Sequence, residues 1–117
     1  MTIRLKRVYD PPTGKDGYRV LVDRIWPRGL TKDRAKVDLW LKDIAPSTAL
    51  RRWFKHDPHK WHVFQTRYFH ELERLPDQVQ HLKKLAGSKP LTLLYAAKDT
   101  AYNNATALKS FLESHEP

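Results

Sequence analysis

Residues 16–30, DGYRVLVDRIWPRGL, place a continuous apolar run directly before a dense group of charged residues. The run at residues 20–22 is typical of a strand that is covered on both faces, as in a parallel sheet enclosed by other layers. Pro27 and Gly29 end the strand, because they interrupt backbone pairing and favour a turn. A turn requires neither the acid nor the two arginines nor the tryptophan found there, so this stretch either secures the fold by ion pairing or binds a ligand.

Other parts of the chain predict further strands and helices. An apolar run at residues 91–97, LTLLYAA, predicts a second buried strand, and the alternating IRLKRVY at residues 3–9 predicts a strand with one exposed face. Gly87 is predicted to end a helix, and a final amphipathic helix follows the strand at residues 91–97. Signals for the start of a helix precede three stretches with apolar residues at helical spacing: Ser47, Asp57-Pro58 and Pro76.

Strands at both ends of the chain with helices between them are typical of the α/β class. We predict a small, mainly parallel sheet covered by helices in a three-layer-like arrangement, as a single domain over residues 1–117. The link from Tyr9 to Arg19 is short for a parallel crossover, which normally takes about a dozen residues, so the first two strands are either parallel or a hairpin. A hairpin would place Tyr9 at the opposite edge of the sheet from Trp26.

The charge of the chain favours an anionic partner. Lys and Arg number 22 against 13 Asp and Glu, a net charge of +9. Nucleic acids, phosphorylated metabolites and anionic surfaces all have the complementary sign. No window approaches the roughly 20 apolar residues of a membrane span, the start MTIRLKRVYD lacks the apolar run of a signal peptide, and cysteine is absent. We therefore expect a cytoplasmic protein with no membrane partner, in an oligomeric state that the sequence does not fix.

The predicted site lies at the ends of the strands. In open α/β sheets, ligands bind at the carboxyl ends of the strands, and helix N-termini there favour anions. The sequence therefore predicts a pocket for a small anionic ligand that carries phosphate or carboxylate, with arginine forks and a tryptophan wall. The candidate ligand-binding residues are Asp23, Arg24, Trp26, Arg28, Lys98, Asp99, Asn103 and Asn104.

Two alternatives concern these same residues. Asp23 paired with Arg24 or Lys98 would be a structural ion pair that fixes the strand order, and Trp26 would then only close the end of the core. If a reaction takes place, Asp23 or Asp99 is the candidate general base and Lys98 the electrostatic stabiliser. Nothing in the sequence fixes a reaction, so whether the protein is an enzyme stays open.

No metal or cofactor is expected. His59 and His62 lie at helical spacing, but no carboxylate occupies a natural third position on that face, which favours a surface histidine cluster over a metal site. Ser47 is explained as a helix cap, because no base is specified near it. The motifs GxGxxG, the P-loop and HExxH do not occur in the chain.

A nucleic-acid-binding module is the main alternative function, and a structural or partner-binding domain is the third. Trp53 and Trp61 fall on the apolar stripes of their helices, which makes them core residues rather than platforms for stacked bases. The basic strip that would contact nucleic acid comprises Arg51, Arg52, Lys55, His59, Lys60, His62 and Arg67.

Four motifs resemble a known family. KRVYDPP (6–12), DGYRVLVDRIWPRGL (16–30), APSTALRRWF (45–54) and LTLLYAAKDTAYNNA (91–105) resemble, in order and nearly end to end, the YeaO-like proteins, a bacterial family of domains of unknown function. The resemblance implies a small cytoplasmic α/β protein and no established activity.

A wider set of related domains has a Val-Asp-Val-Arg type motif followed by proline, and a cysteine, histidine and arginine cluster after the final strand. The segment at residues 22–24, with Pro27, is similar to the first motif, which favours the parallel arrangement of strands. The second motif is absent here, and Asn103-Asn104-Ala105 stands in its place. The resemblance therefore implies a site that binds without catalysing.

Overall fold

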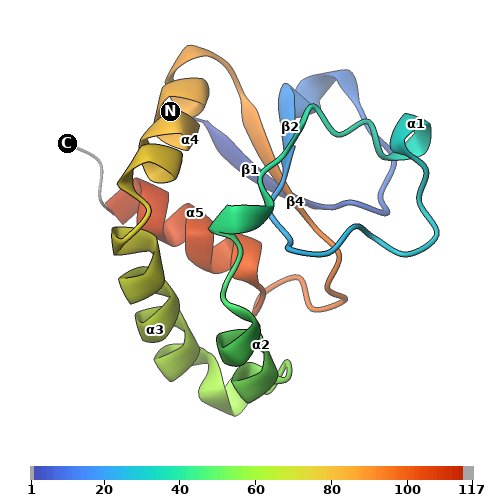
Figure 1. Cartoon of the computed structure of the whole chain (residues 1–117). Helices are drawn as coiled ribbons and strands as arrows, with labels where there is room; N and C mark the ends of the chain where they lie inside the picture. Colours follow the sequence, from blue (N-terminus) through green and yellow to red (C-terminus); the bar gives the residue numbers. More distant parts are fainter. Residues whose placement is uncertain (1, 115–117) are drawn as a thin grey trace.

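The computed structural model describes residues 2–114, and in these residues four strands form one sheet (Figure 1). The strands are β1 (Ile3–Arg7), β2 (Tyr18–Leu21), β3 (Leu39–Trp40) and β4 (Leu91–Tyr95), in the order β1-β4-β2-β3 with every pair parallel. The predicted α/β class with a parallel sheet is confirmed. The hairpin alternative is wrong, because β4 lies between β1 and β2 and pairs with both.

Helical structure begins at the three predicted starts, Ser47, Asp57-Pro58 and Pro76, whereas the short helix at residues 32–35 was not predicted. The helices are α1 (Lys32–Ala35), α2 (Thr48–Phe54), α3 (Trp61–Glu73), α4 (Pro76–Ser88) and α5 (Asn104–Ser114), with short 3-10 turns η1 (Gly14–Asp16), η2 (Lys42–Ile44) and η3 (Pro58–Lys60). Ser47 caps α2 by accepting a hydrogen bond from the backbone N–H of Leu50 at 3.2 Å, and Asp57 caps η3 in the same way through His59. Pro76 is the first residue of α4.

The predicted end of α4 is wrong. The helix continues through Gly87 to Ser88, and Lys89 is then extended. Pro90 explains this end, because the residue before a proline is disfavoured in the helical conformation. The Ser88 hydroxyl also donates to the carbonyl of Leu85 at 3.2 Å. The chain therefore leaves the helix without a left-handed glycine.

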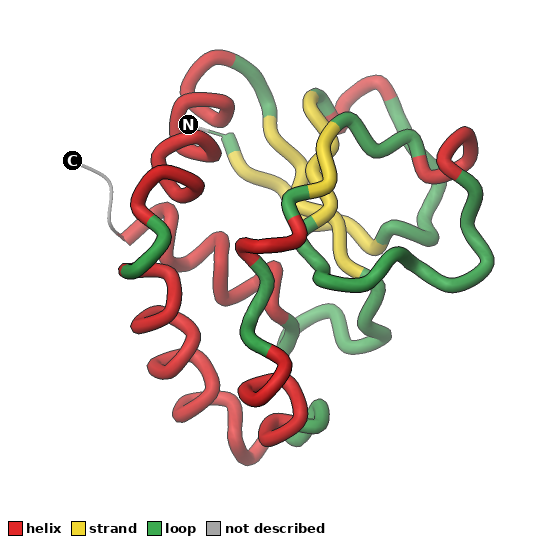
Figure 2. The backbone as a smooth tube through the Cα atoms, in the orientation of Figure 1, coloured by secondary structure: helices red, strands yellow, loops and turns green. Residues whose placement is uncertain are grey.

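One face of the sheet is covered by helices, which lie together on that side in Figure 2. The apolar positions of α3 that recur at helical spacing, Phe64, Tyr68 and Leu72, are buried there with Leu93 of β4. The Tyr68 hydroxyl donates to the carbonyl of Ile44 at 2.6 Å, so the core helix also holds the segment that precedes α2. This cluster makes the helical layer and the sheet one packed unit.

The other face is covered by the long connection between β2 and β3, which includes α1. Leu21 and Leu94 point into a second buried cluster with Val8 and Ala35, against which Trp26 packs. Figure 1 shows α1 on the opposite side of the sheet from α3 and α4. The third layer is thus an irregular segment with one short helix.

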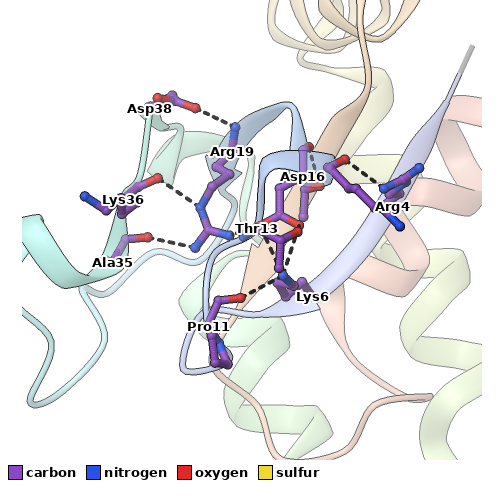
Figure 3. Close-up of polar contacts among 11 residues, drawn as sticks. Arg4, Lys6, Pro11, Thr13, Asp16, Arg19, Ala35, Lys36 and Asp38 are labelled. Atoms are coloured by element: carbon purple, nitrogen blue, oxygen red, sulfur yellow. Dashed lines mark hydrogen bonds and ion pairs between the residues drawn. The ribbon is translucent and has the colours of Figure 1, made fainter.

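A charged network fastens this third layer to the sheet (Figure 3). Asp16 accepts hydrogen bonds from Lys6 at 2.9 Å and from Arg19, whose guanidinium also donates to the carbonyl of Ala35 at 2.8 Å. Burial raises the pKa of Asp16, but the donors Lys6, Thr13 and Arg19 outweigh it and hold that pKa well below its usual range. The network is thus built around an ionised carboxylate.

Candidate functional site

A cleft of about 720 Å³ opens at the carboxyl ends of β2 and β4. Four parts of the chain line it: residues 23–28 after β2, residues 45–56 around α2, Phe64 of α3, and the segment after β4 with the start of α5. Parallel strands bring their carboxyl ends to one edge, which is where α/β proteins bind ligands. The cleft therefore lies at the predicted edge.

Asp23 lies at the floor of the cleft and joins the ends of the two central strands. Its Oδ2 accepts the backbone N–H of Ala96 at 2.9 Å, and its Oδ1 accepts Nδ2 of Asn104 at 3.0 Å. Burial raises the pKa of Asp23 above its usual value, while these two hydrogen bonds and the charges of Arg51 and His56 oppose the rise.

The ion-pair alternative for Asp23 is wrong in its partners. Among residues 2–114, Asp23 forms no ion pair with Arg24 or Lys98, and the ion pairs found belong to Asp16. Asp23 joins the ends of β2 and β4 through amide donors instead of an ion pair. The side chain of Asn104 adds to this connection, because its Nδ2 also donates to the carbonyl of Val22 at 3.0 Å.

Arginines from two segments of the chain line the cleft. Arg28 comes from the loop after β2, and the exposed Arg51 and Arg52 come from α2. Arg24 also lines the cleft, but its Nη2 donates to the carbonyl of Ala45 at 3.0 Å and its Nε faces the carbonyl of Pro46 at 3.4 Å. Arg24 therefore fixes the segment that leads into α2. The edge of its guanidinium formed by Nε and Nη2 is engaged by these carbonyls and does not serve as an anion fork.

The wall beside Arg28 is apolar. Ile25 is 63% exposed, and it lines the cleft next to Trp26. The indole of Trp26 donates to the carbonyl of Leu30 at 2.7 Å and contacts Trp40 edge to face at 5.5 Å. Trp26 therefore closes the second core cluster and walls the cleft at the same time.

Two of the predicted residues, Lys98 and Asp99, are not among the residues that line the cleft. Lys98 is exposed. Asp99 stabilises its own loop by accepting the backbone N–H groups of Ala101 at 2.8 Å and Tyr102 at 2.9 Å, which lower its pKa.

Asn103 lines the cleft, but its side chain caps α5. Its Oδ1 accepts the backbone N–H of Thr106 at 2.9 Å, and its Nδ2 donates to the carbonyl of Asp99 at 2.9 Å. The oxygen and the nitrogen of the Asn103 side-chain amide are therefore both engaged within the protein. Asn103 contributes to the cleft by fixing the start of α5.

Sequence reasoning did not assign three basic cleft residues to the site: Arg51, Arg52 and His56. The sequence placed Arg51 and Arg52 on a basic helix, but it did not show that this helix returns to the strand ends. Ser47 fixes that return, because its N–H and hydroxyl both donate to Glu71 of α3, at 2.8 and 2.7 Å. After α2, Lys55 and His56 have left-handed backbones (φ 49° and 56°), which turn the chain at the cleft.

Two further properties concern the described part of the chain. No three His, Cys, Asp or Glu side chains in residues 2–114 are grouped so that they could hold a metal ion. No helix within these residues has the length and the apolar character needed to cross a membrane.

The fold and the cleft define a small α/β protein with an arginine-lined cleft at the carboxyl edge of a parallel sheet. The chain belongs to the family described as the inactive DUF488-N3 subclade, whose model matches residues 2–116. It is similar to the uncharacterized protein YeaO of Escherichia coli (strain K12), with 45% identity over 97% of this chain and 99% of that protein. The resemblance to the YeaO-like proteins is confirmed.

Mycobacterial proteins are also similar. The uncharacterized protein Rv3073c of Mycobacterium tuberculosis (strain ATCC 25618 / H37Rv) is 41% identical over 94% of this chain and 92% of its own length. The uncharacterized protein Mb3100c of Mycobacterium bovis has the same identity and coverage. No solved structure matches the chain.

Proposed function

We propose that the cleft binds a small ligand that carries a phosphate or carboxylate group, and that the protein acts by binding this ligand rather than by transforming it. The observation that carries the proposal is that Arg28, from the loop after β2, and Arg51 and Arg52, from α2, line the same cleft. Guanidinium groups bind carboxylate and phosphate through paired hydrogen bonds, and they keep their charge at any physiological pH.

The shape of the cleft supports a ligand larger than a bare ion. Its volume of about 720 Å³ is within the range of small-molecule sites, about 300–1,000 Å³. Ile25, Trp26 and Phe54 add apolar lining beside the arginines. A ligand with an anionic group and a flat or apolar part matches both kinds of lining.

Binding without catalysis agrees with the chemistry present. The chain contains no cysteine, and asparagines stand where the wider group of related domains has its cysteine, histidine and arginine cluster. Asp23, the acid at the floor, already accepts hydrogen bonds on both carboxylate oxygens. The description of the matching family as inactive points the same way.

Thermal unfolding tests this proposal. The chain is heated with inorganic phosphate, pyrophosphate, citrate and AMP in turn, at low and moderate salt. We expect at least one of these anions to stabilise the chain, by about 2.7 kcal/mol when its concentration is 100 times the Kd. The same anion should stabilise Arg28→Gln and Arg51→Gln much less.

Arg34→Gln is the matched control, because Arg34 is an exposed arginine of α1 that does not line the cleft. Its stabilisation by the anion should equal that of the wild type. If the three variants respond alike, or if no anion of the panel stabilises the wild type, the cleft is not an anion site.

A further inference from the structure

We infer that the ligand of the cleft is one nucleotide of a single-stranded nucleic acid, whose phosphodiester backbone continues from the cleft over the basic residues of α2, η3 and α3. This inference rests on the proposed function and extends it to a substrate class. It depends on three observations: the charge of one segment, its continuity with the cleft, and the exposed apolar wall.

The first observation is local charge. Residues 51–67 contain five Lys and Arg against a single acid, Asp57, so this short segment carries +4 of the net charge of +9. Asp57 is engaged as a helix cap through the N–H of His59 at 3.0 Å. A positive potential concentrated in one segment favours a partner with regularly repeated negative charges.

The second observation is continuity. Arg51, Arg52 and His56 line the cleft, and basic residues of the same segment lie exposed beyond it. We call three of these exposed residues the basic track: Lys55, His59 and Arg67. A ligand confined to the cleft does not reach the track, whereas a polymer that enters the cleft at one nucleotide passes over it.

The track is preformed by contacts around Trp53. The Trp53 carbonyl accepts a hydrogen bond from Nζ of Lys60 at 2.9 Å, and the guanidinium carbon of Arg67 lies 4.4 Å from the centre of the Trp53 ring. These contacts fix α3 against α2 before any ligand binds. They also occupy the Trp53 ring, so we assign phosphate contacts, and no base stacking, to the track.

The third observation is the apolar wall, which selects a single strand. Ile25 is exposed at the cleft beside Trp26, and a base can pack against such a surface only when it is unstacked from its neighbours. A duplex keeps its bases stacked and paired. The arginines of the cleft would then contact the phosphate of the inserted nucleotide.

The test compares AMP with labelled oligonucleotides of about 12 nucleotides, a length within the range bound by single-strand-binding domains. Fluorescence anisotropy is measured with oligo(dT) and oligo(rU) at several salt concentrations. Comparing the two oligonucleotides shows whether the protein binds DNA or RNA. The wild type should bind one of these more tightly than AMP. Duplex DNA and vesicles of phosphatidylcholine with phosphatidylserine are the competitors.

A matched pair of double variants tests the track. Lys55→Gln/His59→Gln removes one lysine and one histidine from the track, and Lys84→Gln/His81→Gln removes the same two types from exposed positions on α4. The track variant should bind the oligonucleotide several-fold more weakly, with a salt slope smaller by about 0.7 for the lysine, while its affinity for AMP is kept. The second variant should match the wild type.

The outcomes separate the two proposals. Equal losses in both double variants, an oligonucleotide that binds no more tightly than AMP, or preferred binding to duplex DNA or to vesicles would overturn the nucleic-acid inference and leave the anion cleft standing. AMP binding that is indifferent to Arg28→Gln would instead overturn the proposed function. Oligonucleotide binding that needs the track but not Arg28 would overturn the inference that a nucleotide enters the cleft.

Discussion

Gly17 allows the close approach of β2 to β4. Its backbone is left-handed (φ 67°), and a Cβ atom placed there would lie 2.1 Å from the carbonyl oxygen of Pro90. That same carbonyl accepts the N–H of Tyr18 at 2.9 Å, at the start of the pairing between β2 and β4. A side chain at Gly17 would therefore separate the two strands where their pairing begins.

Gly17→Ala should lower the free energy of unfolding by about 3 kcal/mol, because a left-handed alanine and a clash with backbone each cost about 1–3 kcal/mol. Gly14→Ala in the same loop is the control, since a Cβ there meets no atom within 4 Å. Its effect should stay within about 0.5 kcal/mol. Urea denaturation measures both, and equal effects of the two substitutions would refute the role given to Gly17.

At the scale of elements, the Asp16 network joins β1, β2 and the third layer. Asp16 and Arg19 are both buried, and the side chain of Arg19 reaches the carbonyls of Ala35 and Lys36 beyond the sheet. Removing the carboxylate charge leaves a buried guanidinium without its counter-charge, which is more costly than the loss of one hydrogen bond. The network therefore stabilises the connection that carries Arg28.

Asp16→Asn should destabilise the chain by about 3 kcal/mol at neutral pH. Because the folded-state pKa of Asp16 lies below its ordinary value of 3.8, its contribution is present above that pH and is lost as the pH falls below it. The stability difference between wild type and variant should therefore shrink in acid. Urea denaturation across this pH range measures it, and a difference that grows in acid would contradict the assignment.

The raised pKa of Asp23 does not confuse this comparison. The contribution of Asp23 to stability depends on pH in the opposite direction to that of Asp16. It is lost as the pH rises through the folded-state pKa of Asp23. Both proteins contain Asp23, so its effect cancels in the difference. Asp33→Asn, at an exposed acid of α1, is the control and should show no comparable dependence on pH.

At the scale of the whole molecule, the sequence predicts what depends on local pattern. The buried run at residues 20–22 and the strand at residues 91–97 predict a covered parallel sheet, and the caps at Ser47 and Asp57 predict where helices start. The central place of β4 was not predictable, because it depends on the close approach of Gly17 to Pro90, 73 residues apart.

The lining of the cleft was predicted in part for the same reason. Asp23, Trp26 and Arg28 follow a strand directly, so the rule for strand ends finds them. Arg51, Arg52 and His56 reach the cleft only because Glu71 and Tyr68 of α3 hold the segment before α2 in place. Lys98 and Asp99 also follow a strand, but their loop turns back on itself through the hydrogen bonds accepted by Asp99.

The central claim is that an anionic ligand occupies this cleft, and a ¹H–¹⁵N NMR titration of the chain with the most stabilising anion of the panel tests it most directly. The account predicts that the largest shift changes fall on residues 23–28, 51–56 and 96–97, and that Arg28→Gln suppresses them at the same anion concentration. Three results would contradict the claim that an anion occupies the cleft: shift changes confined to the basic track, shift changes spread evenly over lysines and arginines, or no shift changes at all.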